Sequence, residues 1–210
     1  MDKVYLCKRI NKGIEIDGNF NKVEWSGINT VMLFDNITEE IPKLKTFVKA
    51  AYDDNYLYFT FKCEDDYKKA TMTKYNDKLY EEDVVEIFID DNNDFKTYIE
   101  IEVNPINTVL HYLINNNLKG NVLGYARVEE KIDCAILNNT TNGEWDVEIA
   151  IPFSEFVTLI NNPPAIGDKW HMNIYRIDRG QNGSDEYSAW SPTGKVNFHM
   201  PEYFGEIVFG

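Results

Sequence analysis

The spacing of apolar residues constrains the fold of this chain more than any other feature. Apolar side chains recur at every second position in short segments, and clusters of Asn, Asp and Gly separate these segments. In 47–64, for example, Asp53-Asp54-Asn55 divides two runs that are rich in aromatic residues. A period of two is that of a β-strand, and two strands joined by such a turn form a hairpin. The sequence therefore predicts many short strands joined by tight turns.

Helices contribute little to this pattern. The one helical signal is "SEFVTLI" at 154–160, where Ser154 is placed to cap the helix and the run ends at an Asn-Asn-Pro-Pro cluster. Because no long helices alternate with the strands, a parallel sheet cannot be built. We therefore expect an all-β fold: an antiparallel two-sheet β-sandwich, immunoglobulin-like or jelly-roll-like, with one short helix. A chain of 210 residues with 43% hydrophobic content fits a single domain covering 1–210.

Charge and composition exclude several classes of partner. The 21 basic and 35 acidic residues give a net charge of −14, which repels a phosphate backbone and an anionic bilayer. We therefore expect no nucleic-acid and no membrane partner. No apolar stretch approaches the roughly 20 residues that a membrane span needs, and the start lacks the apolar segment of a signal peptide. The expected localisation is either cytoplasmic or that of a fragment of a secreted protein.

Cysteine usage gives no sign of a disulfide framework. The three cysteines are an odd number and show no C-x-x-C spacing, which also argues against a zinc site. Cys63 continues the apolar alternation of the preceding residues and is expected to be a small buried side chain. We expect the protein to be a monomer that requires no cofactor.

Carboxylates interrupt the apolar pattern of two neighbouring segments. In "YEEDVVEIFID" at 80–90, one face is wholly apolar, whereas the other places Glu86 between Val84 and Phe88. The next segment, "YIEIEVN", puts four side chains on one face: Tyr98, Glu100, Glu102 and Asn104. Two adjacent strands thus offer a face that is rich in carboxylates and partly apolar. Such a face is suited to a ligand that is itself partly polar and partly flat.

Two aromatic residues lie where strands are expected to end. Tyr80 precedes a strand among polar neighbours, and Trp190 stands before the turn "SPTG". In one interpretation both rings fold back onto the edge of the sandwich. In the other they stack on the C–H faces of a sugar ring, while carboxylates and amides bind the hydroxyl groups around its rim.

Several segments, in this order, carry a resemblance to a known family. These are 16–25, 48–65, 80–90, 98–105 and 145–153, followed by "NIYRID", "YSAWSPT" and "PEYFG". Together they resemble the family 9 carbohydrate-binding modules. The resemblance implies a β-sandwich without catalytic activity that binds plant-type β-glycans, such as xylo- or gluco-oligosaccharides. It also implies a role in polysaccharide degradation beside an attached or partner glycoside hydrolase of the xylanase type.

The same resemblance assigns roles to individual residues. Members clamp a terminal disaccharide between two tryptophans, and these positions fall on Tyr80 and Trp190, while an acidic contact falls on Glu86. Glu102 stands where some members have an arginine, and Arg176 could supply that cation or else form an ion pair. The resulting hypothesis is that two rings stack on the sugar and that four further side chains bind its hydroxyls: Glu86, Glu102, Asn104 and Arg176.

Calcium is a further possibility that the sequence raises. Members of the family hold structural calcium, and Asp90, Asn92 and Asp94 present oxygen atoms at alternate positions. Phe95 stands where an EF-hand requires glycine, so the loop is not an EF-hand. The other interpretation of these residues is a solvated Asn/Asp turn.

Two other functions stay open as alternatives. Glycoside hydrolysis needs two carboxyl groups roughly 5 to 10 Å apart, and Glu86 with Glu102 is the candidate pair. A haem-binding redox sandwich needs two axial ligands, for which Met72 with His111 or His171 are the candidates. Neither pair has a distinctive spacing.

Overall fold

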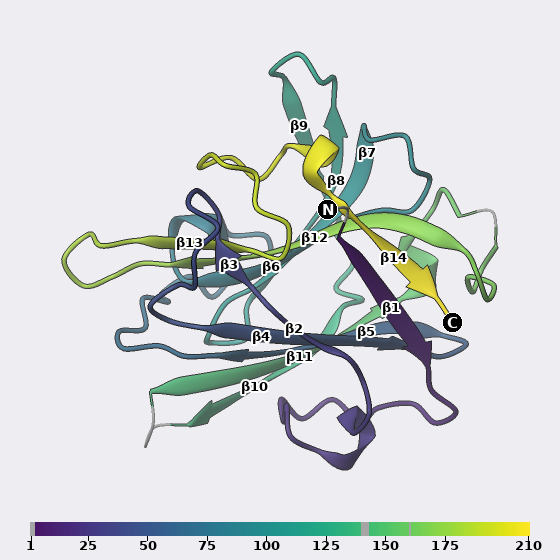
Figure 1. Ribbon diagram of the computed structural model, residues 1–210, viewed down its shortest axis with the longest axis horizontal. Coiled ribbons are helices and arrows are strands. Elements are labelled where there is room, and N and C mark those ends of the chain that lie inside the picture. The colour runs from purple at the N-terminus through teal and green to yellow at the C-terminus, as the bar shows by residue number, and fades with distance from the viewer. Residues whose placement is uncertain (1–2, 140–142, 160) are drawn as a thin grey trace.

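The computed structural model describes residues 3–139, 143–159 and 161–210 (Figure 1). Within these residues the chain forms fourteen strands: β1 (Val4–Arg9), β2 (Thr30–Met32), β3 (Phe34–Asp35), β4 (Thr46–Tyr52), β5 (Tyr56–Cys63), β6 (Val84–Asp90), β7 (Thr97–Val103), β8 (Val109–Asn116), β9 (Val122–Ala126), β10 (Asp133–Asn139), β11 (Glu144–Pro152), β12 (Lys169–Asp178), β13 (Glu186–Ala189) and β14 (Gly205–Phe209). The helical segments are 3-10 turns: η1 (Val23–Trp25), η2 (Leu79–Glu81), η3 (Phe153–Glu155) and η4 (Pro201–Tyr203).

The strands form two layers, as Figure 1 shows. The β5 sheet has the order β10-β11-β5-β4, and β2 pairs with β4. The β6 sheet has the order β14-β12-β6-β7-β8-β9, and β13 and β3 extend it beside β12. β1 joins the two sheets, because its first residues pair with β14 and its last two pair with β4. The strand path ends at β10 and β9 without closing, which confirms the predicted two-sheet sandwich.

The pairing is antiparallel at every interface of the described strands except two. β1 runs parallel to both β14 and β4. The predicted antiparallel pairing therefore holds among the described strands except at β1. The N-terminal strand arrives from outside the hairpin series, so no short turn fixes its direction relative to its neighbours. The hairpin expected around Asp53-Asp54-Asn55 is confirmed as β4–β5.

The main core lies between the sheets. Val85, Ile87 and Ile89 of β6 face it, and they meet apolar side chains of β5 and β11. A second, smaller core covers the outer face of the β6 sheet, where Val84 and Phe88 pack with further apolar side chains. Part of that covering comes from the segment before β14, which supplies Phe198 and Phe204 and lies beside β8 and β9 in Figure 1. The apolar neighbours of Glu86 are thereby explained.

The predicted helix at 154–160 is wrong. Over residues 154–159, the described part of this span, only the 3-10 turn η3 forms, and Ser154 does not cap it, because the N-cap position is Pro152. Phe153 and Phe156 flank this turn and both pack on Trp170, with ring centroids 6.2 and 4.9 Å away. One tight turn is enough to bury both rings. Among the described residues no helix has the length and apolarity that crossing a bilayer requires.

Candidate functional site

A pocket opens on the outer face of the β6 sheet, with a volume of about 550 Å³. Its floor is formed by side chains of three adjacent strands: Glu86 and Phe88 of β6, Glu100 of β7, and Tyr112 and Ile114 of β8. Its walls are Tyr80 from η2, Val122 and Gly124 of β9, Ile177, Arg179 and Tyr187 around β12 and β13, and residues 196–199. This volume lies within the 300 to 1,000 Å³ that is usual for small-molecule sites.

The register of the sheet brings the floor residues together. Phe88, Glu100 and Tyr112 lie opposite one another across β6, β7 and β8, and Glu86 lies opposite Glu102 in the adjacent row. Residues opposite one another in antiparallel strands have neighbouring Cβ atoms on the same face. The alternation within each strand therefore places carboxylates and aromatic rings side by side on one surface.

Aromatic rings line the pocket. The side chain of Tyr80 is 39% exposed, and those of Tyr112 and Tyr187 are partly exposed. Gly124 gives the Tyr112 ring its room, because a Cβ atom at that position would lie 2.6 Å from ring carbon Cδ2. Partly exposed tyrosine rings present apolar faces to a ligand and keep a hydroxyl for hydrogen bonding.

Arg179 contacts two of these tyrosines, Tyr187 and Tyr80. Its guanidinium donates to the Tyr187 hydroxyl at 2.7 Å and lies over that ring, 5.4 Å from the centroid. It also donates to the backbone carbonyl of Tyr80 and to Asp185. One cationic side chain thus fixes η2 and β13 relative to each other. The sequence interpretation missed Arg179 because it follows the last residue of β12, where alternation no longer indicates a face.

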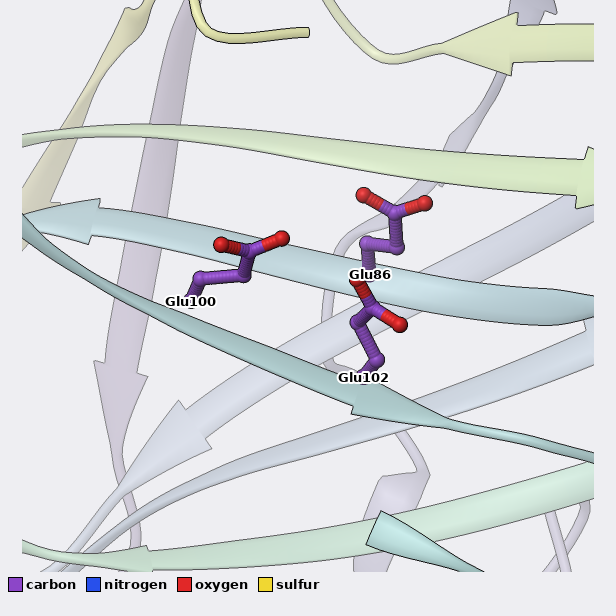
Figure 2. A group of neighbouring side chains, drawn as sticks. All are labelled: Glu86, Glu100 and Glu102. Atoms are coloured by element: carbon purple, nitrogen blue, oxygen red, sulfur yellow. The ribbon is translucent and has the colours of Figure 1, made fainter. Parts of the chain in front are cut away.

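Three buried carboxylates cluster at the floor of the pocket and just beneath it. The exposed fractions of Glu86, Glu100 and Glu102 are 2%, 5% and 0%, and they offer oxygen atoms within 4.8 Å of one another. Figure 2 shows that all three project from the same side of β6 and β7. Burial raises the pKa of Glu100 to about 7. Burial and the neighbouring carboxylates raise the pKa of both Glu86 and Glu102 well above the usual range.

Trp190 is not a wall of this pocket, contrary to the sequence-based hypothesis. Its side chain is 3% exposed and belongs to the core between the sheets, where it meets Tyr5 edge-on at 6.5 Å. Its backbone N–H donates to the carbonyl of Ile174, which continues the pairing of β13 with β12. Because side chains alternate along β13, Trp190 points inward and Tyr187 points outward to the pocket. The segment thus contributes a different aromatic residue from the one expected.

Arg176 also faces away from the pocket. It lies opposite Val85 on the inner face of β12, is 1% exposed, and donates to Asp65 at 3.2 Å and to Asp178. A further bond of 2.6 Å reaches the carbonyl of Glu64, beyond the end of β5. The ion-pair interpretation of Arg176 is therefore confirmed. Its assignment as a ligand-binding cation is wrong, because strand alternation turns it into the interior.

Asn104 has a structural role at the end of β7. Its amide group donates to the carbonyl of Met72 at 3.0 Å, and its oxygen accepts from the backbone N–H of Thr108 at 2.8 Å. The side chain is fully buried and does not line the pocket. These bonds hold the turn into β8, so the predicted contact with a sugar is not available. Glu102 is likewise outside the pocket lining, although it belongs to the carboxylate cluster with Glu86 and Glu100.

The loop considered for calcium holds itself together by hydrogen bonds. Asp90 accepts from the N–H of Phe95 at 2.8 Å, and Asp94 accepts from the N–H of Thr97 at 2.7 Å. Asn92 accepts from the N–H of Asp94 at 3.0 Å. Each of the three side chains thus caps the β6–β7 turn, as in the solvated-turn interpretation. A calcium ion at these residues stays a prediction.

The residues named for the two alternative functions are not arranged for them. Glu102 is fully buried beneath the pocket, so the Glu86–Glu102 pair cannot flank a glycosidic bond. Met72 packs on the outer face of the β6 sheet, whereas His111 lies opposite Ile101 on the inner face. His171 packs on Phe95 at the other end of β7 from Met72. Neither histidine can therefore share a haem iron with this methionine.

Comparison with known proteins gives a consistent result. The family model "Carbohydrate family 9 binding domain-like" matches residues 16–210. A protein of Arthroderma benhamiae named "Extracellular protein" is 28% identical over 195 residues, with 86% of each chain covered.

Solved structures share the fold at low sequence identity. A putative carbohydrate-binding protein from Bacteroides uniformis superposes with a TM-score of 0.82 at 19% identity over the whole of both chains. A family 9 carbohydrate-binding module from Caldicellulosiruptor kristjanssonii, solved with cellotriose, gives 0.71 at 18% identity over 99% of this chain and 93% of that one. A family 9 carbohydrate-binding module from the same organism, solved with glucose, gives 0.70 at 18% identity over 99% of this chain and 96% of that one. Since the family model covers nearly the whole sequence, this chain belongs to the carbohydrate family 9 binding domain-like family.

Proposed function

We propose that the pocket on the outer face of the β6 sheet binds a short saccharide and does not cleave it. The observation that carries this proposal is the juxtaposition of partly exposed tyrosine rings with recessed carboxylates in one cavity of about 550 Å³. A pyranose ring has C–H groups on its faces and hydroxyls at its rim, so it matches both kinds of side chain. Family membership and the two saccharide-bound modules of the same fold support the proposal.

Each part of the pocket has a role in this proposal. Tyr80, Tyr112 and Tyr187 provide the rings that stack on the sugar. Glu86 and Glu100 provide oxygen atoms for hydroxyl groups, and their raised pKa values allow a protonated carboxyl to donate as well as accept. Stacking contributes about 0.5 to 1.5 kcal/mol per ring beyond burial, and a hydrogen bond to a charged group about 1.5 to 3 kcal/mol. After the cost of association, we expect micromolar to millimolar dissociation constants.

The saccharide is proposed from the relatives. Because modules of this fold have been solved with cellotriose and glucose, gluco- and xylo-oligosaccharides of plant-type β-glycans are the first ligands to test. We further propose that the protein supports polysaccharide degradation beside a glycoside hydrolase. Weak binding suits that role, since a binding module acts by raising the local concentration of its partner at the substrate.

Calorimetric titration tests the site directly. Cellotriose, xylotriose and mannotriose are titrated into wild type, Tyr80→Ala, Tyr112→Ala and Tyr56→Ala. Tyr56 is the matched control, because it is 36% exposed, close to the 39% of Tyr80, but lies on β5 in the other sheet. We expect at least one trisaccharide to bind wild type and Tyr56→Ala equally, and about ten-fold weaker binding by each pocket variant.

Three outcomes would contradict the proposal. Failure of wild type to bind any of these saccharides would remove the sugar function as stated. Unchanged binding by both pocket variants would move the ligand to another surface. Release of reducing sugar by wild type, lost in Glu86→Gln, would show hydrolysis and refute the non-catalytic role.

A further inference from the structure

We propose that Glu86, Glu100 and Glu102 form a binding site for one divalent cation of the calcium class at the floor of the pocket. We further propose that this cation holds hydroxyl groups of the saccharide. The second part rests on the proposed function, whereas the first part stands without it. This site is separate from the Asp90–Asp94 turn, because Glu86 lies near the start of β6 and Asp90 is the last residue of that strand.

The carboxylate geometry suits a single ion. Oxygen atoms of the three glutamates lie within 4.8 Å of one another, which is about twice a Ca–O distance of 2.3 to 2.6 Å. One ion placed among them can therefore touch all three side chains. The arrangement is fixed by the sheet, because Glu86 pairs directly with Glu102 and Glu100 is two residues along the same face of β7. Among the described residues, this is the one group of such side chains with that geometry.

Unpaired oxygen atoms provide the second, independent observation. Oε1 of Glu86 and both oxygens of Glu102 are buried, and no N–H or O–H group of the described residues lies in hydrogen-bonding geometry to them. Glu102 does contact another carboxyl, that of Glu100. The buried carboxylate of Glu148, by contrast, is satisfied, because it accepts from the indole of Trp25 at 2.6 Å. A buried polar atom without a partner costs about 1 to 3 kcal/mol, and more when it is charged. A cation would supply the missing interaction for all three oxygens at once.

The protein supplies little positive charge of its own to this cluster. Arg179 is the cation on the pocket wall, but its guanidinium donates to Asp185, Tyr187 and the carbonyl of Tyr80. Arg176 points to the opposite face of the sheet. Three carboxyl groups therefore meet in a buried site, and no basic side chain within 3–139, 143–159 and 161–210 is dedicated to them. Such an arrangement is attractive to an external cation.

Burial favours a metal ion over an ammonium group as that cation. Glu102 is 0% exposed, so a group the size of water does not reach it. A calcium ion contacts oxygen at about 2.4 Å, whereas an ammonium nitrogen needs about 2.8 Å and carries three hydrogens and a carbon. The smaller, bare ion fits the enclosed position better. We therefore infer a metal ion as the occupant of the cluster, and the experiments below include an amino sugar as the alternative.

The position of the ion would leave coordination sites facing the ligand. Glu102 lies below the floor, and Glu86 and Glu100 line the pocket. Protein ligands therefore come from one side, while calcium takes six to eight oxygen atoms in total. The sites on the open side would take water or a pair of saccharide hydroxyls. In this way the cation would connect the buried carboxylates to the sugar.

Titration of calcium chloride into protein freed of metal by a chelator tests the first part. Measurements are made at pH 8, where carboxyl groups lose their protons more readily and metal binding is favoured. We expect one ion per chain for wild type and at least ten-fold weaker binding for Glu102→Gln, which keeps the shape of the side chain. Asp94→Asn is the matched control, because it removes a carboxylate from the turn; we expect its affinity to stay within two-fold of wild type.

Thermal unfolding with and without calcium provides a second readout. Wild type should gain in melting temperature with calcium, whereas Glu102→Gln should be at least as stable as wild type without calcium and gain little. Absence of calcium binding by wild type would overturn the site. So would equal binding by wild type and Glu102→Gln, or loss of binding in Asp94→Asn alone, which would move the ion to the turn.

Saccharide titration with calcium and with chelator tests the second part. We expect the trisaccharide that wild type binds to bind at least ten-fold more weakly in chelator, and Tyr112→Ala still to bind calcium. Calcium binding without any effect on sugar affinity would overturn the bridging role and leave the metal site. Calcium binding with no sugar bound in either condition would refute the proposed function alone. If wild type binds no calcium but binds the β-1,4-linked glucosamine trisaccharide more tightly than cellotriose, the cluster would be reassigned to an amino sugar.

Discussion

Replacing Trp190 distinguishes a core residue from a sugar-stacking ring. The indole is 3% exposed, lies in the core between the sheets and meets Tyr5 edge-on. It also packs so closely on Gly205 that a Cβ atom there would come within 2.6 Å of the indole ring. Trp190→Ala would therefore leave a cavity with rigid walls. The structure predicts that this substitution lowers stability. If Trp190 were instead an exposed ring that stacks on a sugar, the substitution would weaken sugar binding alone.

The size of the effect follows from the buried area. A buried tryptophan removes about 150 to 250 Å² from water, and at about 25 cal/mol per Å² this corresponds to about 4 to 6 kcal/mol. Measured tryptophan-to-alanine changes in cores are about 3 to 5 kcal/mol. We therefore expect Trp190→Ala to lower the free energy of unfolding by about 4 kcal/mol. Trp190→Phe, which fills part of the space, should cost about half as much.

Urea denaturation followed by tryptophan fluorescence measures this change. Three buried tryptophans remain as reporters in the variant: Trp25, Trp145 and Trp170. With a denaturant slope of about 2 kcal/mol per molar, a loss of 4 kcal/mol lowers the urea midpoint by about 2 M. Tyr80→Ala is the comparison, because a partly exposed side chain should change the free energy of unfolding by less than about 1 kcal/mol. Wild-type stability of Trp190→Ala together with lost sugar binding would refute the core placement.

Two further changes test the pocket wall and the interior. Gly124→Val should push the Tyr112 ring into the pocket, because even a Cβ atom at position 124 would lie 2.6 Å from that ring. Calorimetry should then show about ten-fold weaker saccharide binding at nearly unchanged stability. Equal affinity of the variant and wild type would contradict the assigned wall. His111 is buried, neither ring nitrogen has a hydrogen-bond partner although Nδ1 lies 4.0 Å from a Glu155 oxygen, and burial lowers its pKa to about 4. The unfolded chain therefore binds more protons between about pH 6.5 and pH 4, so this residue lowers stability as pH falls through that window. Urea denaturation measures the difference in free energy of unfolding between His111→Leu and wild type, and we expect this difference to favour the variant by about 2 kcal/mol more at pH 5 than at pH 8. The same difference at both pH values would show that His111 does not titrate in this way.

Alternation allowed several features to be predicted without the structure. It placed Ile87 in the core and Glu86 on the other face, and it put Glu100 and Glu102 on one surface of the next strand. These assignments hold because side-chain direction in a strand depends only on the position of a residue along it. The sandwich follows from the same pattern, since strands with one apolar face must bury it against a second sheet.

Residues at the ends of strands could not be assigned in this way. Trp190 and Arg179 each follow the last residue of a strand, where the local pattern stops indicating a face. The first turns inward, and the second turns to the pocket and joins η2 to β13. Tyr112 and Tyr187 were missed for a related reason. The order of strands in the β6 sheet brings these two rings to the same pocket. No short-range pattern in the sequence indicates that order.

The sequence by itself thus determined the class of fold, the two faces of each strand and the concentration of carboxylates on one of them. Only the tertiary structure decided which aromatic rings surround those carboxylates and which are used to fill the core. The physical reason is that alternation is a property of neighbouring residues. The walls of the pocket, by contrast, come from η2, β9, β13 and the segment before β14, which packing brings together from distant parts of the chain.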